Sequence, residues 1–208
     1  EDELMQNMHE KSRYNIRLAQ KKGVKVRAAT QDKEAFESFL ELLEETTKRD
    51  GITSWPRERF LKFREKFMTP PLLSSPTSGE ELKEGGIPKA DLLIGELDGK
   101  ILAAAIIMLF GDAGTYLYAA SSAENRSANA PSLVLWGAIR LAKTRGKRWY
   151  DMWGIAPAAA GENHPWAGIT RFKTRYIKVG TTGKELRNIG SRDLVLDKKF
   201  YDLFNLGK

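Results

Sequence analysis

Three stretches of the chain carry basic side chains and no acidic ones. Residues 11–27, 140–148 and 171–178 contain seven, five and four of them, which is 16 of the 34 lysines and arginines in a sequence of net charge +7. Lys and Arg grouped in this way bind the phosphates of a nucleic acid or of a phosphorylated ligand. The pattern therefore predicts a phosphate-bearing partner, with solvated helix faces as the alternative explanation.

Side chains that serve as metal ligands or covalent nucleophiles are scarce. The sequence has no Cys and only two His, His9 and His164. It therefore excludes disulfides, thiolate metal sites and a Cys nucleophile, and it offers too few imidazoles for a His-rich metal site. No metal or cofactor is expected. His164, which precedes Pro165, is expected to cap or pack the loop that enters the last helix.

The same features bear on the compartment. The absence of Cys favours a reducing environment. The most apolar run, residues 101–110, is too short to cross a bilayer, and the first residues lack the basic and apolar regions of a secretory signal. These observations predict a cytoplasmic globular protein.

Local patterns in the first part of the chain predict three helices and a strand. Residues 1–23 read as a polar linker helix that ends at Gly23, and residues 24–28 alternate like a short strand. Thr30 is expected to cap the next helix, and Pro56 to open another. The helix after Thr30 has four apolar residues on one face: Phe36, Phe39, Leu40 and Leu43.

The remaining patterns predict a sheet and two more helices. Residues 68–90, rich in Pro, Ser and Gly, read as a flexible loop or insertion. A hairpin turns at Asp98-Gly99, a third strand spans residues 115–120, and residues 149–153 form a strand parallel to it. Between these last two strands lies a helix, residues 132–144. Four of its apolar residues are expected to point inward: Leu133, Trp136, Ile139 and Leu141. A final helix and final strands follow.

This order of elements is typical of a GNAT-like acyltransferase domain, an α/β fold with a mixed, mostly antiparallel sheet flanked by helices. GNAT enzymes that use acetyl-CoA hold its pyrophosphate on backbone N–H groups of a Gly-rich loop before the helix that follows the third strand. The corresponding stretch here, residues 121–131, contains no Gly. A pyrophosphate cradle is therefore not expected, and another acyl donor must be sought.

Six short motifs occur in a fixed order along the chain. They are KSRYNIR (11–17), TKR (47–49), YLYAASS (116–122), AP (130–131), YDMWGI (150–155) and HPWAGITRFK (164–173). In this order they resemble the FemABX family of peptidoglycan-precursor aminoacyltransferases, in particular its C-terminal GNAT-like domain, over residues 11–199. The resemblance implies a linker helix at residues 1–23 and a GNAT-like domain at 24–208. Family members build their muropeptide site partly from a first GNAT-like domain, for which this chain has no room.

The family resemblance implies transfer of Gly, Ala or Ser from aminoacyl-tRNA to the stem-peptide amine of a UDP-linked or lipid-linked muropeptide, in the synthesis of cell-wall interpeptide bridges. The lipid-linked substrate implies peripheral contact with the inner membrane face. An aminoacyl ester is already activated, so a neutral amine attacks it without a covalent enzyme intermediate. Such an enzyme mainly positions its substrates and stabilises an oxyanion.

The resemblance also implies roles for two pairs of residues near the reacting ester and the muropeptide. Phe172 and Lys173 match the motif placed at the acceptor end of the tRNA, where Lys173 supplies a positive charge against the ester oxygens. The alternative is a solvated Lys173 on a helix with Phe172 in the core. Tyr116 and Tyr118 are expected on one face of the third strand, where the family uses tyrosines for the muropeptide, or else as ordinary half-buried strand residues.

Three further residues are candidates for the same site. Thr47 and Arg49 match the Thr-x-Arg that grips the precursor diphosphate in the family, although a surface Arg at a helix end is common. Asp151 either orients Lys173, accepts the amine proton, or serves as a structural hydrogen-bond acceptor. Four tryptophans are predicted to lie in the core: Trp136, Trp149, Trp153 and Trp166.

Two other functions stay open on the sequence. An acetyl-CoA-dependent N-acetyltransferase is compatible with the fold but is opposed by the Gly-free stretch at 121–131. A non-catalytic RNA-binding module is compatible with the charge, yet no RNA-binding signature accompanies it.

Overall fold

Five β-strands, in the order β1-β2-β3-β4-β5, form one sheet at the centre of the structure. The computed structural model describes residues 1–68, 88–157 and 159–177. In chain order the elements are α1 (Asp2–Gln6), α2 (Glu10–Lys21), β1 (Lys25–Ala28), α3 (Lys33–Asp50), α4 (Arg57–Phe67), β2 (Lys89–Leu97), β3 (Lys100–Phe110), β4 (Ala113–Ser121), a 3₁₀ turn (Arg126–Ala128), α5 (Ala130–Thr144), β5 (Trp149–Asp151) and α6 (Ala167–Thr174).

The sheet is mixed and mostly antiparallel, as the sequence predicted. Strands β1 to β4 pair antiparallel with their neighbours, whereas β5 pairs parallel with β4 because α5 connects the two strands as a crossover. The hairpin between β2 and β3 is confirmed. Asp98 and Gly99 both have positive φ, 52° and 77°, as the tight turn of a two-residue hairpin requires.

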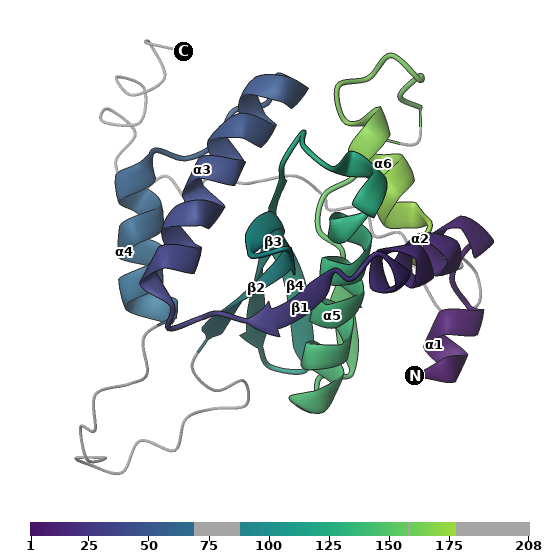
Figure 1. Cartoon of the computed structure of the whole chain (residues 1–208), viewed down its shortest axis with the longest axis horizontal. Helices are drawn as coiled ribbons and strands as arrows, with labels where there is room; N and C mark the ends of the chain where they lie inside the picture. The colour runs from purple at the N-terminus through teal and green to yellow at the C-terminus, as the bar shows by residue number, and fades with distance from the viewer. Residues whose placement is uncertain (69–87, 158, 178–208) are drawn as a thin grey trace, which may run out of the picture. The chain divides into compact units, whose positions relative to one another are not determined.

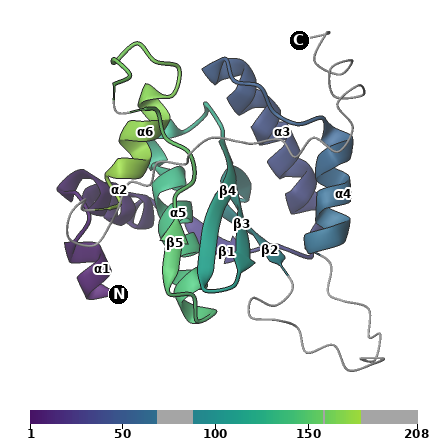
Figure 2. The same cartoon turned by 180° about the vertical axis from the view of Figure 1, so that it is seen from behind.

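Helices cover both faces of the sheet, and each face has its own apolar core (Figures 1 and 2). One core lies under α2, α5 and α6 and contains the fully buried Ile16 and Leu135. The other lies under α3 and α4 and is built around Phe36, Phe39 and Phe60. Helix α5 buries Leu133 and Trp136 as predicted, while Ile139 and Leu141 are only half-buried.

A β-bulge in β4 corrects one prediction about the tyrosines. Ile106 of β3 pairs with Tyr118 and the next residue, Ile107, pairs with Tyr116, so Leu117 is left without a partner. One extra residue reverses the alternation of side chains. Tyr116 therefore lies in the core under α5, whereas Tyr118 packs on the core under α3 and α4. The prediction that the two tyrosines share one face is wrong.

The N-terminal elements differ from prediction in detail. The polar segment contains two helices, α1 and α2, and the second packs on α5 through Ile16 and Ala19. The cap of α3 is Asp32, whose carboxylate accepts a hydrogen bond from the Ala35 N–H at 3.0 Å. Thr30 instead donates to Asp91 of β2 at 2.9 Å, because the β1–α3 connection runs beside that strand. Pro56 precedes α4 by one residue.

No helix in the described ranges is long and apolar enough to span a bilayer. Most of the predicted loop at 68–90 and the predicted final strands fall outside the described residues.

Candidate active site

Lys173 is a buried lysine on the last turn of α6. Its side chain reaches back to the loop after β5, where the ammonium Nζ donates a hydrogen bond to the Gly154 carbonyl at 2.9 Å. One turn earlier, the Thr170 hydroxyl accepts a hydrogen bond from the Ala156 N–H at 2.8 Å. Two side chains of α6 therefore hold the β5–α6 loop in place. Only 8% of the Lys173 surface is exposed, so the alternative of a solvated lysine does not apply.

Burial changes the acid–base chemistry of Lys173. Removal of water lowers the pKa of its ammonium to about 8, from an ordinary value of 10.5, and the negative charge of Asp151 opposes this shift. A lysine with a pKa near neutrality can donate a hydrogen bond as a cation and also exchange its proton at physiological pH. Asp151 does not bond to Lys173 directly. Its carboxylate Oδ1 accepts from the Trp153 N–H at 2.7 Å.

Phe172 and Tyr116 lie on the same side of the sheet as Lys173. Phe172 is half-buried and packs on Tyr176, with ring centroids 5.3 Å apart. Tyr116 is buried, and burial together with the neighbouring Tyr176 raises the pKa of its hydroxyl. Tyr116 is therefore a neutral side chain of the core under this site.

The sheet opens beside this group. Strands β4 and β5 pair only from Ala113 to Thr115 and from Trp149 to Asp151, and β4 then continues to Ser121 without a strand partner on that side in the described residues. Asp151 lies at the last pair, and the loop that holds Lys173 begins directly after it. The candidate chemical groups are thus gathered where the two parallel strands separate.

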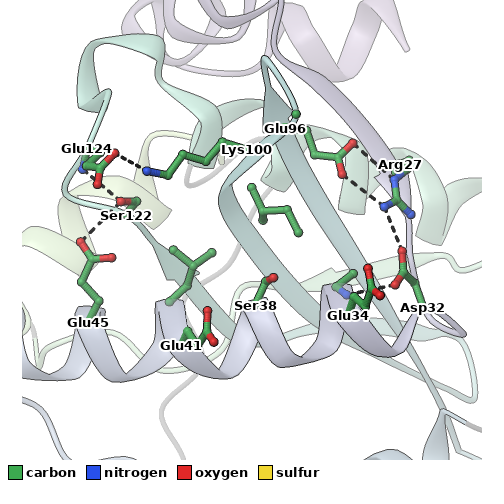
Figure 3. A pocket seen from close by; sticks show the side chains of 14 residues that line it. Arg27, Asp32, Glu34, Ser38, Glu41, Glu45, Glu96, Lys100, Ser122 and Glu124 are labelled. Atoms are coloured by element: carbon green, nitrogen blue, oxygen red, sulfur yellow. Dashed lines mark hydrogen bonds and ion pairs between the residues drawn. The ribbon is translucent and has the colours of Figure 1, made fainter.

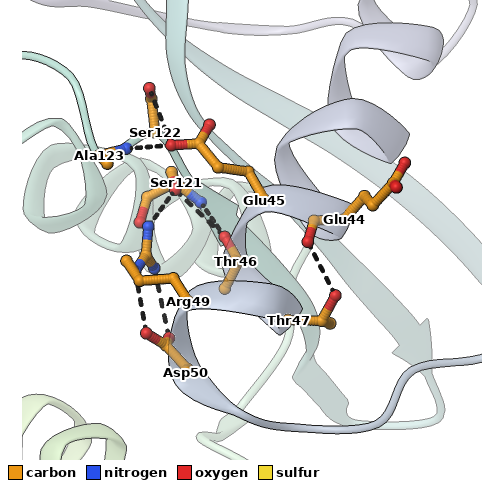
Figure 4. A network of polar contacts seen from close by, with 9 residues as sticks. All are labelled: Glu44, Glu45, Thr46, Thr47, Arg49, Asp50, Ser121, Ser122 and Ala123. Carbon is orange, nitrogen blue, oxygen red and sulfur yellow. Dashed lines mark hydrogen bonds and ion pairs between the residues drawn. The ribbon is translucent and has the colours of Figure 1, made fainter.

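Arg49 and Thr47 lie at the C-terminal end of α3 in a different network (Figure 4). The Arg49 guanidinium pairs with Asp50 through two contacts of 2.9 and 3.2 Å and donates to the Ser121 carbonyl at 2.8 Å. Thr47 donates to the Glu44 carbonyl of its own helix. The threonine that reaches the strand is Thr46, whose hydroxyl bonds both the N–H and the carbonyl of Ser121.

The helical pattern offered a signal for Thr46. It follows Phe39, Leu42 and Leu43 at the spacing of the buried face of α3, and Thr47 is one position off that face. Arg49 therefore reaches the end of β4, whereas Thr47 bonds only within α3, and neither contact joins them to Lys173 and Phe172.

Tyr118 belongs to an aromatic cluster under α4. Its ring makes edge contacts with Trp55 and Phe60, at centroid distances of 5.3 and 4.9 Å. The Arg59 guanidinium lies 3.8 Å above the Trp55 ring. Burial raises the pKa of the Tyr118 hydroxyl, and the charge of Arg59 opposes the rise. Sequence reasoning missed Trp55 and Arg59.

The sequence matches the FemAB family over residues 1–70 and 87–207. The chain belongs to the FemAB family. No curated protein sequence matches the chain at a significant level.

Solved structures agree on the fold. The crystal structure of FemX has 19% sequence identity and a TM-score of 0.68, and the match covers 84% of this chain and 55% of that one. The C-terminal domain (DUF2156) of a putative lysylphosphatidylglycerol synthetase from Agrobacterium fabrum has 10% identity and a TM-score of 0.53, with 80% and 50% covered. The chain spans about half the length of these structures. It has the mixed α/β fold, a sheet flanked by helices, that the sequence predicted.

The loop before α5 in this FemAB-family chain already holds a carboxylate. Glu45 of α3 accepts a hydrogen bond from the Ala123 N–H at 2.5 Å and lies 3.5 Å from the Ser122 hydroxyl. Asn125 and Asn129 take the left-handed conformations that Gly usually adopts. A protein carboxylate therefore occupies one backbone N–H group of this loop.

Three of the four tryptophans predicted for the core are at the surface. Trp136 is buried as expected, but Trp149, Trp153 and Trp166 are 64%, 56% and 44% exposed. The prediction failed because β5 has only three residues and is the last strand of the sheet in the described residues, so that Trp153 and Trp166 lie beyond it. His164 does cap this loop, since its Nδ1 accepts from the Trp166 N–H at 3.0 Å. His9 has the same use at the start of α2.

Within the described residues, four bases of the acid-free stretches pair with carboxylates outside those stretches. Arg140 pairs with Glu1, Arg145 with Asp91 and Arg148 with Asp112. Arg27 is held between Asp32 and Glu96. By contrast, three exposed bases of α2 have no ion-pair partner within the described residues: Lys11, Arg17 and Lys21. Helix α2 therefore presents positive charge that is available to a ligand.

A surface pocket of about 530 Å³ lies between α3 and the β2–β3 hairpin, away from Lys173 (Figure 3). Two bases and six carboxylates line it: Arg27, Lys100, Asp32, Glu34, Glu41, Glu45, Glu96 and Glu124. Excess negative charge disfavours phosphates, so this pocket does not suit the phosphate-bearing ligands that the sequence predicts.

Proposed function

We propose that this FemAB-family chain is part of a tRNA-dependent aminoacyltransferase. In this proposal it moves Gly, Ala or Ser from aminoacyl-tRNA to the stem-peptide amine of a UDP-linked or lipid-linked peptidoglycan precursor, at the cytoplasmic side of the membrane. Membership of the family supports a transferase of cell-wall synthesis. The observation that carries the proposal is Lys173, a buried cation held beside the opening between β4 and β5.

In the proposed reaction the acceptor amine attacks the ester carbonyl, a C–N bond forms, and the C–O bond to the ribose breaks. The amine loses one proton, and the leaving ribose hydroxyl gains one. The Lys173 ammonium would stabilise the oxyanion of the intermediate, and its lowered pKa suits a group that also passes a proton. Phe172 would support the reacting end, and Asp151 would favour the charged form of Lys173.

The muropeptide is assigned to the side of β4 that faces α3 and α4. Tyr118 would contact its organic part, and Arg49 with Thr47 would bind its diphosphate. Because the Arg49 guanidinium already pairs with Asp50, phosphate binding requires Asp50 to give way. The acidic pocket beside α3 and the loop before α5, where Glu45 accepts the Ala123 N–H, are less suited to a diphosphate because both contain carboxylates.

Transfer of a radiolabelled amino acid from charged tRNA to a muropeptide tests this function in the full-length protein. Lys173→Met should lower turnover by about two to three powers of ten, the usual cost of losing one oxyanion donor. Lys173→Arg should recover only part of the loss, because a planar guanidinium cannot replace a compact ammonium in a closed site. A folded Lys173→Met protein with near wild-type turnover would assign Lys173 a purely structural role.

A further inference from the structure

Two exposed indoles border the backbone group that holds Lys173. Trp153 directly precedes Gly154, whose carbonyl accepts the Lys173 hydrogen bond. On the other side, Trp166 lies against the same glycine, since a Cβ placed on Gly154 would be 3.6 Å from Trp166 Cζ3. Both indoles are exposed although tryptophan gains more than most residues from burial. Large apolar side chains beside a buried cation therefore face the solvent.

The backbone of Trp153 is strained. Its φ of 63° lies in the left-handed region, which is a genuine outlier for a bulky residue and costs about 1 to 3 kcal/mol. Asp151 fixes the conformation by accepting the Trp153 N–H, and Lys173 fixes the next residue through its carbonyl. The chain thus holds a strained backbone at a residue that is more than half exposed. Core packing explains neither feature.

We propose that Trp153 and Trp166 form a stacking platform for the unpaired nucleotides at the 3′ end of the RNA that carries the aminoacyl ester. This inference rests on the proposed function, because it takes the ester to react beside Lys173. The ester is attached to the last nucleotide, so the last bases must lie close to the place where Lys173 is held. Trp153 and Trp166 are the exposed aromatic residues there.

The chemistry of the surroundings favours nucleotides over other ligands. Every base has a π-face that stacks on an aromatic ring, and each such stack contributes about 1 to 3 kcal/mol. Arg171 and Arg175, on or next to the same helix as Lys173, have no carboxylate partner in the described part of the chain. They supply positive charge for the adjoining phosphates. A sugar ring of the muropeptide also stacks on tryptophan, but the diphosphate of the muropeptide is assigned to Arg49, so the muropeptide gives no role to Arg171 and Arg175.

The test compares two RNAs and two exposed tryptophans, Trp153 and the control Trp149. Binding of uncharged tRNA to the full-length protein is measured by filter binding at low salt, once with intact tRNA and once with the same tRNA shortened by its unpaired 3′ nucleotides. Trp153→Ala should weaken binding of intact tRNA by about 5- to 100-fold and leave the shortened tRNA unaffected. Trp153→Phe, which keeps a ring, should retain most of the affinity.

Trp149→Ala is the control, because Trp149 is equally exposed but lies at the opposite end of β5. It should change neither affinity. Circular dichroism shows whether each variant is folded. Trp153→Gly removes the indole and also relieves the left-handed strain, so a loss of affinity in this variant reports the lost stacking. It should lose affinity as Trp153→Ala does.

Three outcomes overturn the platform. An equal loss for intact and shortened tRNA would place Trp153 in a general RNA surface. A loss confined to muropeptide binding would assign the indoles to the acceptor sugar. A Trp153→Ala protein that still binds intact tRNA more tightly than shortened tRNA would overturn the platform and leave the proposed function untouched. Wild-type protein that binds neither RNA would overturn the proposed donor, which is a failure of the proposed function itself.

Discussion

Lys173 combines a hydrogen bond to one carbonyl with almost complete burial, and this combination has a thermodynamic consequence. The folded protein lowers the pKa of the ammonium to about 8, while the unfolded chain restores 10.5. Below about pH 8 both states hold the proton, and the folded state bears the full cost of a desolvated charge. As pH rises from 8 toward 10.5, the folded state loses the proton first and that cost disappears.

Wild-type protein should therefore gain stability relative to Lys173→Met as pH rises from about 8 to 10.5. Other titrating groups cancel because both proteins contain them. The measurement is the free energy of unfolding in urea at several pH values for each protein. A difference between the two proteins that stays constant with pH would mean that Lys173 titrates as an ordinary exposed lysine.

Arg49 provides a second prediction for single residues. Arg49→Ala should weaken binding of a UDP-linked muropeptide about tenfold or more and leave tRNA binding nearly unchanged. Asp50→Asn should strengthen muropeptide binding, because it removes the carboxylate that now occupies the guanidinium. Isothermal calorimetry measures both. Equal losses for muropeptide and tRNA in Arg49→Ala would assign Arg49 to the general basic field of the protein.

Among the elements, α2 has an outer face whose exposed bases form no ion pair in the described residues. Ser12, Ile16 and Ala19 bury one side of it against α5, while Tyr14, 63% exposed, lies among Lys11, Arg17 and Lys21 on the other side. The first turn of α2 also contacts the end of α6, since the His9 N–H and the Ser12 hydroxyl both donate to the Arg175 carbonyl. The start of α2 is thus joined directly to the end of the helix that carries Lys173.

The prediction for this element compares two triple variants of equal charge. Replacing Lys11, Arg17 and Lys21 by Ala should weaken tRNA binding and reduce the slope of log affinity against log salt by about 2. Replacing Arg140, Arg145 and Arg148 should have little effect, because phosphates there would meet Glu1, Asp91 and Asp112. The same loss in both variants would show that only net charge matters.

Features that depend on residues close together in the sequence could be predicted, and features that depend on residues far apart could not. The β2–β3 hairpin depends on neighbouring residues and was predicted. The inward face of α5 was predicted only in part, because Leu133 and Trp136 are buried but Ile139 and Leu141 are not fully so. The bulge at Leu117 depends on pairing with β3, and the ion pairs of Arg140 and Arg145 join residues far apart in the chain. Such features leave no local signal. The wrong assignment of Tyr118 to the face of Tyr116 is a direct result.

The candidate site shows the same division. The motif around Phe172 and Lys173 pointed to a basic side chain near the end of the last helix, and the structure adds that this lysine is buried. The hydrogen-bond partner of Lys173 could not be predicted from the sequence, because every residue has a backbone carbonyl and nothing in the sequence marks that of Gly154. Strain at Trp153 was likewise invisible, since it arises from the Asp151 and Lys173 contacts on either side.

For the whole molecule, the position of α5 determines how the sheet is covered and where its opening lies. Glycines bring the helix close to the strands. A Cβ on Gly114 of β4 would lie 2.8 Å from Ala142 Cβ, and one on Gly95 of β2 would lie 2.7 Å from Val134 Cγ2. The Val134 side chain can rotate, but Ala142 Cβ moves only if the helix backbone moves. Gly114 is therefore the stricter contact, and it lies in the stretch where β4 still pairs with β5.

Gly114→Ala should destabilise the protein by about 1 to 3 kcal/mol, the usual cost of overpacking, and should also lower transfer activity because it displaces α5 and β5 beside the opening. Gly168→Ala is the matched control. Gly168 lies within α6, has no positive φ and would meet no atom within 4 Å, so Ala there should stabilise by about 0.5 to 1 kcal/mol. Urea unfolding measures both signs. A neutral Gly114→Ala would mean that Gly114 does not set the spacing between α5 and the sheet. Destabilisation by Gly168→Ala would mean that an added methyl group costs stability even where it meets no atom, so that a loss in Gly114→Ala could not be assigned to the α5 contact.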